Sequence, residues 1–336
     1  MKPTILSASK RFFQTSFTAV ILAAAFLAAL RFGSVDISWA SVFEYLAGTI
    51  DASTPDAMIL RELRIPRVLC AMLAGAAFAV SGAVLQGILR NPLASPEITG
   101  VSAGGGVAGL IAMLFFAADP HVTVVAVFAG ALLTASAVYL LSWKNGVSPL
   151  RLILAGIAFS SLCGAVGSTL MYLESEKMSG VLSFMLGSLA MRSSADLAAV
   201  IPFAAAGLAI ALIMAKKLDI MQLGDDTAKS LGVNVELSRT LLLLATVLLA
   251  ASAVSIAGLL GFAGLVVPHF VRLLFSISDS RTLILRSAVF GAVFVTICDT
   301  IGRSAFAPIE VPAGVLTSLA GPPFFLWLLF RNERVS

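Results

Sequence analysis

Ten apolar segments, separated by polar stretches, run through this chain of 336 residues. A helix needs roughly 20 apolar residues to cross the hydrocarbon core of a bilayer, and most of the segments reach that length. Only 12% of the residues are charged, about half the share found in soluble proteins. The chain therefore lacks the polar side chains that a soluble surface needs, which excludes a soluble enzyme, a disordered chain and a secreted disulfide scaffold. The sequence predicts an all-α polytopic membrane protein, with residues 1–336 forming one transmembrane domain.

The predicted spans cover approximately residues 13–33, 65–89, 98–117, 121–142, 150–173, 196–215, 240–260, 264–276, 283–303 and 312–330. The eighth is the shortest, and Pro268 near its beginning indicates a helix start or a broken helix. The first follows Lys2, Lys10 and Arg11, as a signal peptide would. Its length and the membrane span after it favour an uncleaved helix.

The distribution of charges orients these spans, because Lys and Arg concentrate on the cytoplasmic side of a membrane. With a cytoplasmic N-terminus, most of the 22 Lys and Arg residues lie on the inner side and most of the 18 acidic residues on the outer side. Ten spans then place both termini in the cytoplasm. In this topology Glu97 belongs to the inner surface.

Two polar loops stand out between the spans. In the outer loop 34–64, Trp39, Phe43 and Leu46 follow each other at helical spacing, which indicates a helix at the membrane interface. In the inner loop 216–239, Asp225 or Asp226 is a candidate cap for a short helix that ends near Gly232. Such a helix is either a contact for a cytoplasmic partner or a connector, and the residues alone do not decide between them.

A faint internal repeat relates two of the apolar segments. Residues 79–87 and 253–261 agree at six of nine positions, and each stretch is soon followed by a proline, Pro92 or Pro268. The two stretches cross the membrane in opposite directions in the topology above. This pattern is typical of the inverted repeats that frame the pathway of a transporter.

The chemistry that the residues offer is sparse. Gly-Lys does not occur in the sequence, so the chain has no phosphate-binding loop of its own. Asp299 lies four residues before Arg303 in the ninth span, where the two share a helical face and can pair. An ion-coupled carrier would need carboxylates near the membrane midplane, and Asp299 is the one weak candidate. No catalytic constellation, metal-ligand cluster or cofactor motif is present, so we expect neither an enzyme nor a cofactor-binding chain.

Several sequence blocks, in a consistent order over nearly the whole chain, carry a family resemblance. They include Arg64-Ile-Pro-Arg67, Arg90-Asn-Pro-Leu-Ala-Ser-Pro96, Gly100-Val-Ser-Ala-Gly104, Gly261-Phe-Ala-Gly-Leu-Val-Val-Pro-His269 and Glu310-Val-Pro-Ala-Gly-Val-Leu-Thr317. With them the chain resembles the FecCD-type permeases of iron-siderophore, haem and cobalamin importers. These are the transmembrane subunits of type II ATP-binding-cassette (ABC) importers.

The resemblance implies a multi-pass permease of the bacterial cytoplasmic membrane that works as a dimer, with an identical chain or a paralogue. Two ATPase subunits would bind on the inner side and supply ATP hydrolysis, and a substrate-binding protein would dock on the outer side. No nucleic acid is implied as a partner. The implied cargo is a ferric siderophore or similar iron chelate that passes whole. Haem, cobalamin and, in a different class, an ion-coupled carrier are the alternatives.

The resemblance also assigns roles to individual residues. Arg64, Arg67 and Arg303 match outer positions that pair with acids of the binding protein, although interfacial snorkelling of their side chains is the alternative. Asn91 and Leu93 match an inner constriction, whereas Ser148-Pro149-Leu150 give no clear match to a second one. The ATPase-coupling loop is assigned to Leu223, Gly224, Asp225, Asp226, Ala228, Leu231 and Gly232.

Overall fold

The computed structural model describes residues 8–116, 120–143, 149–174 and 178–332. Within these ranges the chain is helical and contains no strand. Lys2 and Ser148 lie outside the described residues. The helices are α1 (Ala8–Arg31), α2 (Trp39–Ala47), α3 (Pro55–Met58), the π-helical turn η1 (Ile59–Arg64), α4 (Ile65–Leu89), α5 (Val101–Phe115), α6 (Pro120–Leu141), α7 (Pro149–Leu173), α8 (Met178–Met185), α9 (Ser194–Gln222), α10 (Asp225–Ser230), α11 (Val235–Ala257), α12 (Ala263–Phe275), α13 (Ser280–Ser304) and α14 (Ala313–Asn332).

Each of the ten predicted spans coincides with one helix, namely α1, α4, α5, α6, α7, α9, α11, α12, α13 and α14. Among the described residues, six helical stretches are long and apolar enough to cross a membrane, and they contain α4, α6, α7, α9, α11 and α13. Apolar stretches of α1, α5 and α12 are shorter. The chain is therefore an all-helical integral membrane protein, and the total of ten spans stays a prediction.

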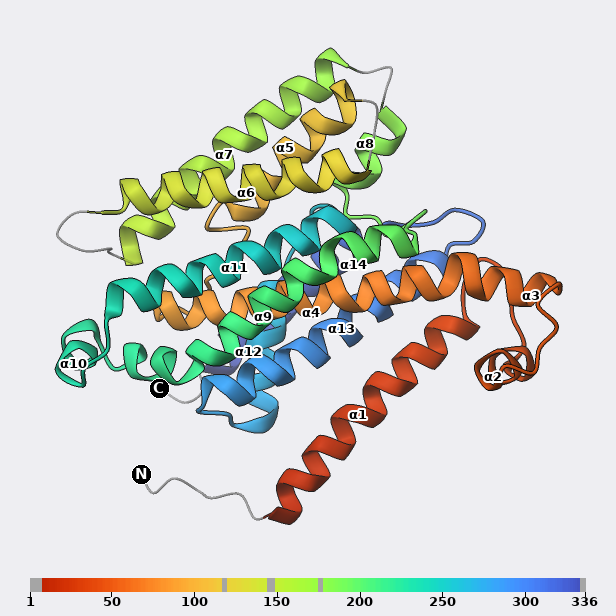
Figure 1. Ribbon diagram of the computed structural model, residues 1–336, viewed down its shortest axis with the longest axis horizontal. Helices are drawn as coiled ribbons and strands as arrows, with labels where there is room; N and C mark the ends of the chain where they lie inside the picture. Colours follow the sequence, from red (N-terminus) through yellow and green to blue (C-terminus); the bar gives the residue numbers. More distant parts are fainter. Residues whose placement is uncertain (1–7, 117–119, 144–148, 175–177, 333–336) are drawn as a thin grey trace.

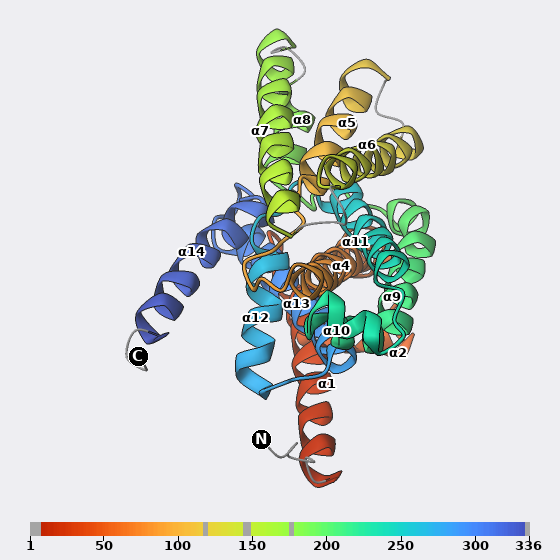
Figure 2. The same cartoon turned by 90° about the vertical axis from the view of Figure 1, so that its left-hand side faces the viewer.

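Helix α4 lies in the centre of the molecule, between α9, α11, α12 and α13 (Figure 2). All its residues from 77 to 89 are buried. Small residues let the neighbouring backbones approach α4 closely. Gly75 faces the backbone of Gly291 on α13, and Gly82 faces the backbone of Gly264 on α12. This packing of small residues is the usual basis of close helix contacts in membranes.

The two ends of the molecule differ in what they carry. The beginning of α1 and the end of α14 lie at the same end as α10, whereas α2 and α3 lie at the opposite end (Figure 1). We call these the inner and the outer end. Helices α4 and α11 run in opposite directions, and each is followed by a short helix, α5 or α12. This arrangement agrees with the inverted repeat predicted from residues 79–87 and 253–261.

The segment between α4 and α5 does not follow the inner surface as predicted. The hydroxyl of Ser160 donates a hydrogen bond to the backbone carbonyl of Glu97 over 2.9 Å. Ser160 lies eleven residues after Pro149, the first residue of α7, which corresponds to about 16 Å along the helix. The placement of Glu97 on the inner surface is therefore wrong, because the chain turns back toward the middle of the molecule before α5 begins.

The two polar loops contain the predicted short helices. Trp39, Phe43 and Leu46 lie exposed on α2, as their spacing predicts. In the inner loop, Gly224 with φ +115° is the N-cap of α10 and makes no side-chain cap bond. The prediction that Asp225 or Asp226 caps this helix is wrong, because both acids lie inside its first turn.

Candidate functional site

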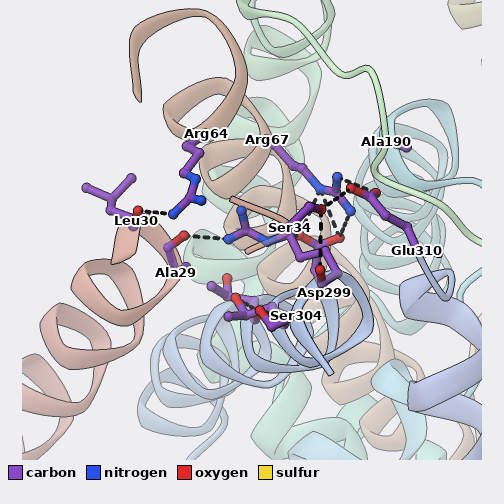
Figure 3. A network of polar contacts seen from close by, with 12 residues as sticks. Ala29, Leu30, Ser34, Arg64, Arg67, Ala190, Asp299, Ser304 and Glu310 are labelled. Carbon is purple, nitrogen blue, oxygen red and sulfur yellow. Dashed lines mark hydrogen bonds and ion pairs between the residues drawn. The ribbon is translucent and has the colours of Figure 1, made fainter. Parts of the chain in front are cut away.

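At the outer end, the guanidinium of Arg67 joins three elements. Arg67 lies in the first turn of α4, and its Nη2 is 2.8 Å from Oδ1 of Asp299 on α13. Its Nη1 is 2.8 Å from Oε2 of Glu310, which lies between α13 and α14. Glu310 also accepts a hydrogen bond of 3.0 Å from the hydroxyl of Ser34. Figure 3 shows these residues converging on one point.

The other two arginines of this cluster fasten the end of α1 to it. Arg303 lies 3.6 Å from Asp299, measured from Nε to Oδ2, and its Nη2 donates to the carbonyl of Ala29. Arg64 donates to the carbonyls of Leu30 and Val35. The predicted pairing of Asp299 with Arg303 is confirmed, and Asp299 also pairs with Arg67.

Burial separates these residues into an inner set and an accessible one. Arg64, Arg303 and Asp299 retain 4%, 3% and 2% of their exposure, whereas 36% of the Glu310 side chain is exposed. The structure thus brings the three predicted docking arginines together but turns their guanidiniums toward groups of this chain. Glu310 is the accessible member of the cluster, and Arg67 beside it keeps 13% of its side chain exposed.

The electrostatics of this outer cluster depend on Asp299. Two guanidiniums, those of Arg67 and Arg303, share its carboxylate, and buried charges are tolerated only when they are paired and hydrogen-bonded. Glu310 adds a second acid at the edge of the cluster. Burial raises the pKa of Glu310, but the hydrogen bond and charge of Arg67, together with the hydrogen bond from Ser34 and the charge of Arg303, hold that pKa below its usual value.

At the inner end, α10 presents part of the predicted coupling loop to solvent. Leu223 and Leu231, which flank α10 in the sequence, are exposed, whereas Ala228 within α10 is fully buried. Gly232 has φ +80°, a conformation that favours glycine. Two exposed leucines around a short anchored helix form a surface that a cytoplasmic partner can contact.

The predicted inner constriction adjoins this surface. Asn91 follows the end of α4, and its side-chain oxygen accepts a hydrogen bond of 2.9 Å from the backbone N–H of Leu93. Leu93 is exposed. Arg90, directly before this turn, pairs with Asp225 of α10 over 3.0 Å, so an ion pair connects the segment predicted as a gate with the segment predicted as a coupling loop. The segment Ser148-Pro149-Leu150 gave no clear match to a second constriction, and its residues Pro149 and Leu150 are the first two residues of α7.

Sequence reasoning missed four residues of these two clusters. Glu310 and Arg90 belong to sequence blocks that carry the family resemblance, but the residues with which they pair lie far away in the chain. Arg239, which is 2% exposed and pairs with Asp225 over 2.8 Å, carried no local signal. Ser34 belongs to a polar loop with many similar residues. Among the described residues, no group of three His, Cys, Asp or Glu side chains has the arrangement of a metal site.

Comparison with known proteins identifies the family of the chain. Residues 21–331 match the FecCD transport family. The Fe(3+)-citrate import system permease protein YfmE of Bacillus subtilis (strain 168) is 36% identical, with 99% of each chain covered. The hemin transport system permease protein HmuU of Yersinia pestis is 37% identical, with 95% of each covered.

A solved structure, described as an inward-facing conformation of a metal-chelate type ABC transporter, has a similar fold. The two chains are 29% identical and superpose with a TM-score of 0.80, over 94% of this chain and 97% of the other. The match to the family extends over most of the sequence and the fold. This chain therefore belongs to the FecCD transport family.

Proposed function

We propose that the chain is the permease subunit of an ABC importer in the cytoplasmic membrane of a bacterium. A separate ATPase drives it, and an extracytoplasmic binding protein supplies a ferric siderophore or a similar iron chelate. The observation that carries this proposal is α10, a short helix at the inner end with exposed leucines on both sides and direct ion pairs to α4 and α11. An ATPase subunit that binds α10 is therefore connected through these ion pairs to the membrane helices α4 and α11.

The cargo class rests on the relatives. Permeases named for ferric citrate and for hemin are similar to this chain over nearly its full length. Both cargoes are iron complexes in which organic ligands enclose the metal. We propose the iron chelate as cargo and keep haem and cobalamin as alternatives.

A second permease chain completes the proposed pathway. Helix α7 is mostly exposed in the single chain, with Leu154, Ile157 and Leu162 facing outward. On the same helix nothing lies within 4 Å of the Cβ position of Gly164. Small residues among apolar ones permit close helix packing in membranes. These features support a dimer contact along α7, with an identical chain or a paralogue.

The ATPase contact is tested by removing the apolar surface around α10. The double variant Leu223→Asp, Leu231→Asp places two charges on that surface, and we expect the ATPase subunit to stop co-purifying with the chain. Phe43→Asp is the matched control, because Phe43 is an exposed apolar residue at the outer end. Undiminished co-purification of the ATPase with the double variant would contradict the assignment of α10.

A further inference from the structure

One carboxylate at the inner end connects three helices. Asp225 lies in the first turn of α10. Its Oδ1 is 3.0 Å from Nη2 of Arg90, the C-cap residue directly after α4, and its Oδ2 is 2.8 Å from Nη2 of Arg239 on α11. The two oxygens of one side chain therefore hold two arginines from different membrane helices.

The pair with Arg239 is a firm anchor. The Arg239 side chain is 2% exposed, and its other acidic partner, Glu236, lies farther away at 3.4 Å. Separating Asp225 from Arg239 would leave a buried guanidinium with a single weak partner, which is costly. This ion pair therefore fixes α10 to the beginning of α11.

The pair with Arg90 connects α10 to the segment that directly precedes the predicted gate residues Asn91 and Leu93. Arg90 has φ +49°, in the left-handed region that few residues other than glycine adopt. The turn Asn91–Leu93 follows directly and is closed by the hydrogen bond between the Asn91 side chain and the Leu93 N–H. The Arg90 side chain is therefore attached to the chain directly before a compact, hydrogen-bonded turn.

We propose that Asp225 is the positioning residue that transmits movement of α10 to the Arg90–Leu93 turn. The inference rests on the proposed function, in which α10 contacts the ATPase, and on the role of Leu93 in an inner gate that the family resemblance implies. When the ATPase moves α10, the Asp225 carboxylate moves Arg90 while Arg239 keeps α10 in register with α11. Without Asp225 the ATPase still binds the surface around Leu223 and Leu231, but movement of α10 no longer displaces the Arg90–Leu93 turn.

The experiment uses the chain reconstituted with its ATPase subunits and binding protein. Asp225→Asn and Arg90→Gln each remove one side of the pair, and Asp225→Glu restores the charge. Arg281→Gln is the matched control, because Arg281 is an exposed arginine at the beginning of α13, also at the inner end. Two quantities are measured, iron imported per ATP hydrolysed and the ATP-dependent change in thiol labelling of Leu93→Cys in a background without the native cysteines.

We expect the ATPase to co-purify with all variants. Import per ATP should fall about fivefold in Arg90→Gln, the effect of a partly exposed ion pair, and at least as much in Asp225→Asn, which also loses the buried partner Arg239. The double variant should be no worse than Asp225→Asn alone, because that substitution already removes the contact with Arg90. Labelling of Leu93→Cys should lose its response to ATP, Asp225→Glu should recover most of the coupling, and Arg281→Gln should match the unsubstituted chain.

Unchanged import per ATP and an unchanged labelling response in both variants would overturn the transmission role of Asp225 and leave the proposed function intact. Additive losses in the double variant would also overturn it, because they would show two independent roles. If the unsubstituted chain does not associate with an ATPase subunit, the proposed function itself fails. The three results are therefore distinguishable.

Discussion

The guanidinium of Arg67 on α4 and the carboxylate of Asp299 on α13 face each other at 2.8 Å, although 232 residues separate them in the chain. This pair closes the outer ends of two central helices against each other. Because Arg303 lies beside the same carboxylate, Asp299 is the shared acidic partner of two guanidiniums. The stability of the outer end should therefore depend on Asp299 more than on any exposed acid.

Replacing Asp299 by Asn should strongly destabilise the fold. The variant leaves Arg67 and Arg303 without their shared buried acid, and breaking a buried ion pair costs about 3–5 kcal/mol. The measurement is thermal unfolding of the purified chain in detergent. Asp36→Asn is the control, because it breaks only the exposed pair with Arg31, which contributes about 1 kcal/mol or less. Equal melting temperatures for the two variants would refute the central position of Asp299.

Replacing Glu310 by Gln should strengthen docking of the binding protein. Glu310 occupies Nη1 of Arg67, so it competes with any carboxylate that a partner offers to this arginine. Removing the competitor should lower Kd about fivefold, the effect of a partly exposed ion pair. The Kd is measured at low ionic strength, where such pairs are strongest. Glu62→Gln removes the same charge from the same end as a control, and a weaker complex with Glu310→Gln would contradict the prediction.

The stability of the outer end should also depend on pH through Glu310. Its pKa in the folded chain lies below the ordinary value of 4.5. A depressed pKa stabilises the fold above the unfolded-state value, and this contribution is lost as the pH falls through the folded-state value. Between about pH 5 and about pH 3, the melting temperature of the unsubstituted chain should fall more steeply than that of Glu310→Gln. Parallel curves would show that the pair contributes nothing.

The close contact of α4 with α12 should tolerate no added methyl group. A Cβ on Gly82 would overlap the backbone carbonyl of Gly264, whereas a Cβ on Gly180 would have its nearest neighbour 4.0 Å away. Overpacking of a tightly packed interior costs about 1–3 kcal/mol. Gly82→Ala should therefore lower the melting temperature and the yield of folded protein, and Gly180→Ala should not. Normal stability of Gly82→Ala would show that the two helices lie farther apart than described.

Hydropathy predicted where the helices lie, because a bilayer imposes the same length on every span. All ten predicted segments coincide with helices, including the short α12, and the spacing of Trp39 and Phe43 predicted α2. The spacing of Asp299 and Arg303 predicted their contact, because residues four positions apart lie on the same face of a helix. Contacts within one helix can therefore be predicted from the residue spacing of a single sequence.

Contacts between distant segments could not be predicted in this way. Nothing near Arg67 indicates Asp299 or Glu310 as partners, and nothing near Arg239 indicates Asp225. Hydropathy also failed at Glu97, since a polar stretch that returns into the molecule has the same composition as a surface loop. Such a segment is tolerated only where protein surrounds it. Its protein environment forms only when α4, α7 and α12 pack together, so the sequence of the segment alone does not reveal it.

The most direct test of the proposed function is iron uptake into proteoliposomes that contain the chain, its ATPase and its binding protein. Labelled ferric citrate, a ferric hydroxamate and hemin serve as the three probes. We predict that uptake of at least one requires both ATP and the binding protein, and that it continues when ionophores collapse the proton and sodium gradients. Uptake that proceeds without ATP and stops when these gradients collapse would contradict the account and identify an ion-coupled carrier.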